Sequence, residues 1–175
     1  MAAPRFVDQL NVQIGNELAA HNQYLACAVH YDAETIPRMA AFFYRQALEE
    51  REHAMMMVQY LIDADERVTI PGVASPVTSF NSLEEPIALA LAQERRVADQ
   101  INELTGTARD ARDFASDQFM QWFIKEQVEE ISLMGDLLTV VRRSKDDIED
   151  IEEWVARETG RMPADPSAPA VAGAE

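Results

Sequence analysis

Hydrophobic residues recur at alternating steps of three and four positions in four long segments of the chain. These segments are residues 10–28, 39–61, 87–105 and 120–141. Residues with that spacing lie on one face of an α-helix, so each segment is predicted to form a long helix with one apolar stripe. Four such stripes are buried together when the helices pack around a common axis.

The connections between these segments indicate the order in which the helices run. Residues 66–82 contain Pro71, Gly72 and Pro76 and show no helical period, whereas the first and third connections are short. A helix of about 28 residues is roughly 42 Å long, and an extended chain of about 17 residues reaches roughly 56 Å. The long connection can therefore return the chain along the whole bundle. The predicted fold class is all-α: a four-helix bundle with one long crossover connection and parallel second and third helices.

The C-terminal part of the chain shows two different patterns. Ile148, Ile151, Trp154 and Val155 have helical spacing, which predicts a short amphipathic fifth helix that ends at Gly160. Residues 161–175 are rich in proline and alanine and are expected to be disordered. The predicted organisation is thus one domain, residues 1–160, followed by a disordered tail, residues 161–175.

Composition and charge narrow the class of function. The chain has 175 residues, of which 47% are hydrophobic and 26% are charged, a balance typical of a globular protein. Its net charge of -16 repels nucleic acid and attracts cations. It lacks a long uncharged apolar run and an N-terminal signal-peptide pattern, so neither a membrane nor export is expected. Cys27 is the only cysteine, so no internal disulfide is possible, and we expect a cytoplasmic location.

The four apolar stripes carry glutamates near their centres. These residues are Glu17, Glu50, Glu94 and Glu130. Burying unpaired carboxylates is costly, so a shared cation is the natural explanation for their position. His53 lies three residues after Glu50 and therefore on the same helical face. Four carboxylates and one imidazole suit iron or manganese better than structural zinc, and their charges balance two divalent ions. A dinuclear metal site is predicted, with Gln127 beside it.

Several short motifs resemble those of bacterial non-haem ferritins. They are "NELAAHNQY" from Asn16, "EEREH" from Glu49, "LAQER" from Leu91 and "FMQWFIKEQVEE" from Phe119. The spacing between the motifs matches as well, and the resemblance covers about residues 5–158. It implies a ferritin-like four-helix bundle that stores iron in a shell of 24 identical subunits, with a ferroxidase site inside each bundle. Fe(II) and either O2 or H2O2 would be the substrates.

The resemblance also implies roles for individual residues. Glu17, Glu50 and His53 would bind the first iron, and Glu50, Glu94 and Glu130 the second, with Glu50 as the bridge. Tyr24 and Gln127 match residues that lie beside the oxygen site. A possible third iron site is implied by three more acids: Glu49, Glu126 and Glu129.

Related protein classes remain as alternatives. A haem-containing bacterioferritin would carry a methionine directly after the bridging glutamate, where this chain has Arg51, so no haem is expected. Another di-iron carboxylate oxidase would generally carry a second Glu-x-x-His motif, and no histidine follows Glu126. A purely structural bundle, with incidental acids, is the alternative from outside the metal-binding classes.

Overall fold

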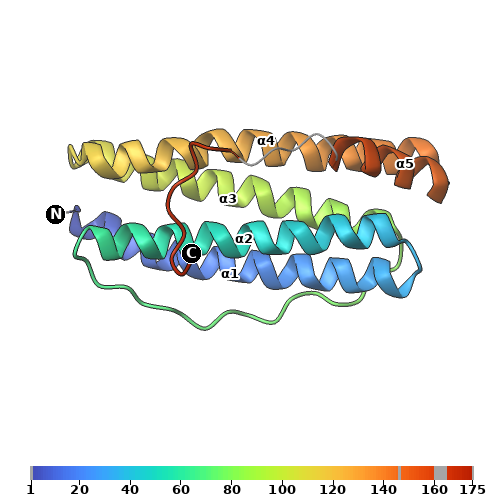
Figure 1. Ribbon diagram of the computed structural model, residues 1–175, viewed down its shortest axis with the longest axis horizontal. Helices are drawn as coiled ribbons and strands as arrows, with labels where there is room; N and C mark the ends of the chain where they lie inside the picture. Colours follow the sequence, from blue (N-terminus) through green and yellow to red (C-terminus); the bar gives the residue numbers. More distant parts are fainter. Residues whose placement is uncertain (1, 146, 160–164, 175) are drawn as a thin grey trace.

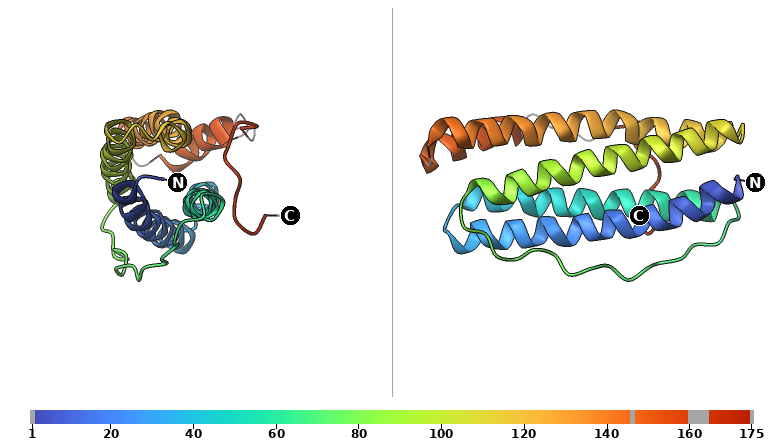
Figure 2. Two further views of the ribbon diagram at one scale, coloured as in Figure 1. Left: turned by 90° about the vertical axis from the view of Figure 1, so that its left-hand side faces the viewer. Right: turned by 180° about the vertical axis from the view of Figure 1, so that it is seen from behind.

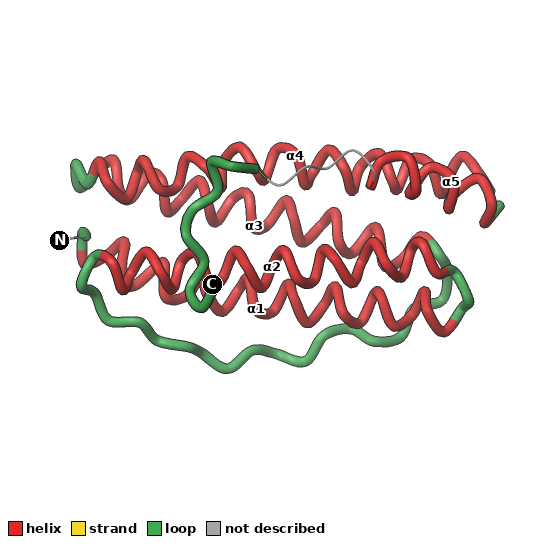
Figure 3. The backbone as a smooth tube through the Cα atoms, in the orientation of Figure 1, coloured by secondary structure: helices red, strands yellow, loops and turns green. Residues whose placement is uncertain are grey.

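The chain forms five helices and no strand in the residues that the computed structural model describes, which are 2–145, 147–159 and 165–174 (Figures 1 and 3). The helices are α1 (Pro4–Ala33), α2 (Pro37–Asp63), α3 (Glu84–Asp110), α4 (Phe114–Ser144) and α5 (Ile148–Thr159). The all-α prediction, with four long helices and a short fifth, is confirmed. No helix in the described part of the chain is both long and apolar enough to span a lipid bilayer.

Local sequence signals explain where the helices begin and end. Proline occupies the first turn of α1 and α2, where a missing N–H leaves no hydrogen bond unmade. Asp113 caps α4, since its carboxylate accepts a hydrogen bond of 3.1 Å from the Ser116 N–H. The first four helices are each followed by a residue in the left-handed region, and none of these is glycine: Thr35, Asp65, Arg112 and Lys145.

Residues 64–83 form the long crossover, here called the strap, which runs the length of the bundle (Figures 1 and 2). The strap makes α2 and α3 parallel, as predicted. Asn11 on α1 donates a hydrogen bond to the Arg67 carbonyl and accepts one from the Thr69 N–H. Gln23 in the same way donates to the Val77 carbonyl and accepts from the Val77 N–H. Between these anchors a Cβ at Gly15 would lie 2.6 Å from Pro71 Cγ, so only glycine permits this close approach.

The bundle core consists of two apolar clusters with a polar layer between them. One cluster contains Tyr31, Phe43 and Ile87 near the α5 end, and the other contains Phe6 and Met57 near the opposite end. Each long helix contributes residues to one cluster along half of its length and to the other cluster along the other half, and it crosses from one to the other near its middle. The four central glutamates lie at these crossing points, so the apolar clusters hold the helices in register around them.

The C-terminal segments pack on the outside of the bundle. On α5, Ile151 and Val155 are buried against the core cluster at that end. The predicted helix end at Gly160 and the boundary between domain and tail lie outside the described residues. Residues 165–174 lie on the outside of the bundle (Figure 2) and contact α2 and α4. Asp165 accepts a hydrogen bond from Lys125 Nζ on α4 at 2.9 Å, and the Ala172 N–H donates to the Met55 carbonyl on α2 at 3.2 Å. Disorder of the tail as a whole stays a prediction.

Candidate metal centre

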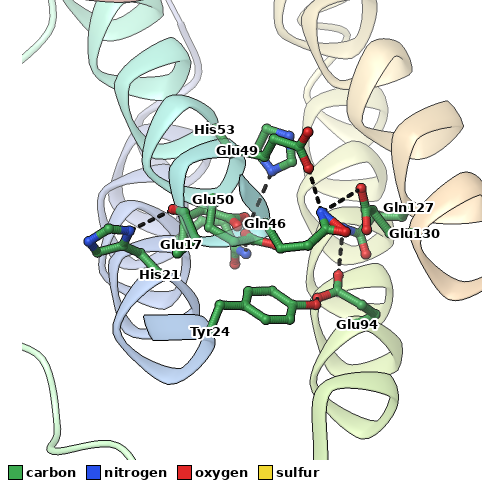
Figure 4. Close-up of polar contacts among 12 residues, drawn as sticks. Glu17, His21, Tyr24, Gln46, Glu49, Glu50, His53, Glu94, Gln127 and Glu130 are labelled. Carbon is green, nitrogen blue, oxygen red and sulfur yellow. Dashed lines mark hydrogen bonds and ion pairs between the residues drawn. The ribbon is translucent and has the colours of Figure 1, made fainter. Parts of the chain in front are cut away.

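Every long helix contributes at least one buried carboxylate to the central polar layer (Figure 4). The contributing residues are Glu17 on α1, Glu50 and His53 on α2, Glu94 on α3, and Gln127 and Glu130 on α4. All six are at most 4% exposed. Positions three or four apart on each amphipathic stripe put these side chains on the helix face that points into the bundle.

Glu17, Glu50 and His53 form a compact trio on the α1–α2 pair. One ligand atom from each residue lies within 4.8 Å of the other two, and this is the only such group that the described residues form. His53 Nδ1 lies 3.6 Å from Glu50 Oε2. Both oxygens of Glu50 and the Oε2 atom of Glu17 are buried without a hydrogen-bond partner. Orphaned carboxylate oxygens in the core are costly, and a bound cation would satisfy all of them.

Glu94 and Glu130, on the α3–α4 pair, lie across the layer and are held by hydrogen bonds. Glu94 accepts from the Tyr24 hydroxyl through Oε1 and from Gln127 Nε2, at 3.2 Å, through Oε2. Glu130 accepts from Gln46 Nε2 at 3.3 Å, while its second oxygen has no partner. Figure 4 shows these side chains facing the trio from the opposite helices. This half could offer further carboxylate oxygens to an ion, but it does not join the compact group.

Burial and mutual repulsion perturb the titration of this layer. Burial, followed by the neighbouring carboxylates, raises the pKa of Glu50 and Glu130 well above the ordinary value. Burial likewise raises the pKa of Glu94 to about 7, although the Tyr24 hydrogen bond opposes this. Burial lowers the pKa of His53, which favours the neutral imidazole that a metal ion requires. A bound cation would favour the ionised carboxylates and so oppose these upward shifts in pKa.

Two glutamines bond the central carboxylates and were not predicted from the sequence. Gln13 Nε2 donates to Glu17 Oε1 at 2.8 Å, and Gln46 donates to Glu130 and also to Glu49. Gln46 lies four residues before Glu50, within the second predicted helix, and that spacing was the available signal. The nearby His21 does not face the trio, because its Nδ1 pairs with the Ala47 carbonyl at 2.6 Å (Figure 4).

Glu49, Glu126 and Glu129 are less buried than the central layer. Glu49 and Glu126 are half-buried, and the Glu129 side chain is 61% exposed and lies 3.6 Å from Lys125 Nζ. Burial raises the pKa of Glu126 to about 7, and the charges of Glu129 and Glu49 add to this effect. The three acids therefore sense one another electrostatically, but they do not form a compact ligand group in the described chain.

The fold and this centre define a class of protein: a one-crossover four-helix bundle with a buried carboxylate and histidine site. The family model of the ferritin-like domain matches residues 7–144. The chain belongs to this family, which confirms the resemblance seen in its motifs.

Individual relatives agree with this assignment. The chain is 48% identical to ferritin BfrB of Mycobacterium tuberculosis (strain Erdman) over 169 residues, covering 97% of this chain and 93% of the relative. The strain H37Rv relative with the same identity is named bacterioferritin BfrB. Bacterial non-heme ferritin of Staphylococcus aureus (strain USA300) is 33% identical over 147 residues, 84% of this chain and 89% of that protein.

Solved structures agree as well. The open pore ferritin of Archaeoglobus fulgidus superposes with a TM-score of 0.86 at 26% identity, covering 93% of this chain and 100% of that one.

Proposed function

We propose that this chain is a subunit of an iron-storing ferritin that oxidises Fe(II) at its central metal centre. The observation that carries the proposal is the trio of Glu17, Glu50 and His53, with three buried carboxylate oxygens left unpaired. Membership of the ferritin-like family supports iron as the ion. Iron is here the substrate and the stored cargo, and the protein supplies its ligands.

The proposed reaction uses both halves of the layer. One Fe(II) binds to Glu17, Glu50 and His53, and a second to Glu94 and Glu130, with Glu50 between the two ions. Each Fe(II) gives one electron to O2, which takes up two protons and leaves as H2O2. With H2O2 as the oxidant, one electron from each Fe(II) breaks the O–O bond, and uptake of two protons gives two water molecules. Four carboxylates and a neutral histidine keep two divalent ions close together without a large net charge.

The side chains around the ligands have distinct roles in this proposal. Tyr24 and Gln127 fix the orientation of Glu94 through hydrogen bonds to its two oxygens. Glu49, Glu126 and Glu129 offer a third, more exposed iron position on the α2–α4 side, from which Fe(III) moves to the mineral. The mineral is deposited inside a hollow shell, for which we propose 24 subunits. Gel filtration should then elute the protein near 24 times its 19.7 kDa chain mass.

The decisive experiment is the double variant Glu50→Ala with His53→Ala. It removes the bridging carboxylate and the only imidazole of the trio, so stopped-flow oxidation of Fe(II) should lose its fast phase while gel filtration still shows the assembled protein. Glu52→Ala, which removes an exposed acid from the same helix, is the matched control and should keep the fast phase. Unchanged oxidation kinetics in the double variant would reject the site.

The name bacterioferritin, carried by one relative, makes haem the second candidate to test. We propose that this chain binds none, because Arg51 occupies the position directly after Glu50. The protein purified from haem-supplemented cells should show no Soret absorption band. A strong band, at a fixed ratio to subunits, would instead assign the chain to the haem-containing class.

A further inference from the structure

Gln46 on α2 lies between the central metal layer and the more exposed acids of the α2–α4 side. It is only 2% exposed, and its Nε2 donates both to Glu49 and, at 3.3 Å, to Glu130. Figure 4 shows the amide joined to both carboxylates. One side chain therefore spans a proposed ligand of the second iron and an acid of the proposed third position.

The acids around Gln46 form a row in which exposure rises from the core to the surface. Glu130 is 2% exposed, Glu49 and Glu126 are half-buried, and the Glu129 side chain is 61% exposed. Burial raises the pKa of Glu130, and the charges of the other three acids are among those that add to this effect. Negative charge therefore accompanies a cation along the whole path from the buried layer to the exposed side.

The oxygen of the Gln46 amide has no partner, in contrast to its nitrogen. Oε1 is buried and makes no hydrogen bond. A buried acceptor without a partner is costly, and nothing would compensate this cost if Gln46 only held two carboxylates in place. A carbonyl oxygen is also a ligand for hard divalent cations, whereas the NH2 group of an amide only donates hydrogen bonds. The unpaired atom of Gln46 is thus the one that could bind a metal ion.

The two ends of this amide suit two different states of the carboxylates beside it. With the carboxylates alone, Nε2 is the favourable end, because its hydrogens bond both of them. A cation bound to Glu130 or Glu49 would repel the NH2 group and attract Oε1. Rotation of roughly 180° about the last side-chain bond exchanges two atoms of similar size and requires no movement of the backbone. Gln46 can therefore present either end in the same space.

We propose that Gln46 is a transfer ligand, which turns its amide and binds through Oε1 an iron ion that moves from Glu130 to Glu49. The inference rests on the proposed ferroxidase function and on its third iron position. During the transfer the ion exchanges the Glu130 oxygen for Oε1 and then gains Glu49; its charge does not change, and no electron moves. When the ion has left, Nε2 turns back to the two carboxylates. Gln46 thereby controls how fast the centre is cleared for the next pair of Fe(II) ions.

Zn(II), which is not oxidised, tests the ligand role without any redox chemistry. Crystals of the unaltered protein soaked in Zn(II) should show anomalous scattering at the trio and beside Glu49, with Gln46 Oε1 about 2.0–2.2 Å from the second ion. That distance identifies the orientation of the amide, because the NH2 group cannot bind a cation. An ion at the trio without one on Gln46 Oε1 would overturn the proposal. If the trio itself binds no ion, it is the proposed metal centre that fails.

Two substitutions at Gln46 distinguish a metal ligand from a hydrogen-bond donor. Gln46→Leu removes the oxygen and the nitrogen, whereas Gln46→Glu keeps an oxygen ligand and replaces the NH2 group. Gln59→Leu is the matched control, because Gln59 lies on the same helix and bonds the exposed Asp63 at 2.7 Å. The Zn(II) ion beside Glu49 should be lost in Gln46→Leu and retained in the other two variants. Loss in Gln46→Glu as well would leave Gln46 only a donor role and overturn the proposal.

Successive additions of Fe(II) measure the same step in solution. Each protein receives two Fe(II) per subunit in the presence of O2, and after a variable delay it receives two more. Gln46→Leu should lengthen the delay needed to recover the fast phase by about tenfold or more. Gln46→Glu and Gln59→Leu should change it by less than about twofold. Unchanged recovery in Gln46→Leu would overturn the proposal, whereas a missing fast phase after the first addition to the unaltered protein would reject the ferroxidase function.

Discussion

On the α1–α2 pair, three buried carboxylate oxygens of Glu17 and Glu50 have no hydrogen-bond partner. On the α3–α4 pair only one oxygen lacks a partner, because both oxygens of Glu94 and one of Glu130 accept hydrogen bonds. The two halves carry similar acids but differ in how many of the carboxylate oxygens have hydrogen-bond partners. An orphaned carboxylate gains most from a cation, while a bonded one must exchange a partner for it. We infer that the α1–α2 half binds the first ion and the α3–α4 half the second.

Removing one ligand from each half gives the largest expected effect. Breaking a buried charge pair costs about 3–5 kcal/mol, so Glu17→Gln should weaken binding of the first Fe(II) by more than about 100-fold. Glu94→Gln should leave the first Fe(II) in place and abolish the second. Anaerobic titration calorimetry counts both ions per subunit. Identical binding curves for the two variants would contradict the proposed order.

The pH dependence of stability tests the contribution of Glu94, in the α3–α4 half, next. A carboxyl whose pKa is higher in the folded protein keeps its proton on folding, so its stabilising contribution is present below the unfolded pKa and is lost as pH rises. For Glu94 this loss falls in the pH window from 4.5, the ordinary pKa, to about 7, the pKa in the folded protein. The shift in pKa corresponds to about 3 kcal/mol in the free energy of unfolding. Urea unfolding of the metal-free protein should show this loss. Glu94→Gln cannot titrate and should flatten that part of the profile; an unchanged slope would exclude Glu94 as its source.

Gln13→Leu should affect the first ion by a smaller amount. Gln13 orients Glu17 through a hydrogen bond of 2.8 Å, and loss of such a supporting bond typically costs about 10-fold in metal affinity. Binding of the first Fe(II), measured anaerobically, should weaken by that factor. Gln9→Leu, a change one turn earlier on α1, provides the control. Equal effects of the two substitutions would mean that Gln13 has no specific role.

Tyr24→Phe should give the smallest change and affect only the second half. It removes one hydrogen bond to Glu94, worth about 1 kcal/mol or roughly fivefold, and leaves the trio intact. Oxidation should slow by that amount while binding of the first Fe(II) is retained. Tyr31→Phe is the matched control, because the Tyr31 hydroxyl bonds the Leu83 carbonyl away from the centre. If Tyr24→Phe also lost binding of the first Fe(II), the proposal that Tyr24 affects only the α3–α4 half would be wrong.

The difference between the halves was not predictable from the sequence, although the four helices and their glutamates were. A glutamate in the middle of an apolar stripe violates the burial preference of charge so strongly that its position alone is informative. Gln13 and Gln46 give no such signal, since an uncharged amide is a tolerable neighbour in many helices. Which carboxylate oxygen stays unpaired depends on rotamers and on partners from other helices, and neither follows from spacing.

Other features were beyond the sequence for similar reasons. Nothing in the sequence distinguishes Gly15 from other helical residues, whereas the structure places the Pro71 ring against it. The contacts of Asp165 with Lys125 and Trp122 join positions 40 and 43 residues apart, within a tail that has no periodic pattern. An open pocket under the strap is likewise lined by side chains from α1, α3 and the strap itself. Long-range packing of this kind leaves no local signature.

If the centre binds Fe(II) as proposed, the unpaired oxygens of Glu50 would also couple the lifetime of the subunit to its iron supply. A ligand that binds only the folded state adds about 2.7 kcal/mol of stability at 100 times its dissociation constant. Subunits without iron would bear the full cost of their orphaned carboxylates and would open more often to proteases, while loaded subunits would persist. The site that collects the metal would then help to set how long the protein survives, with iron scarcity favouring its turnover.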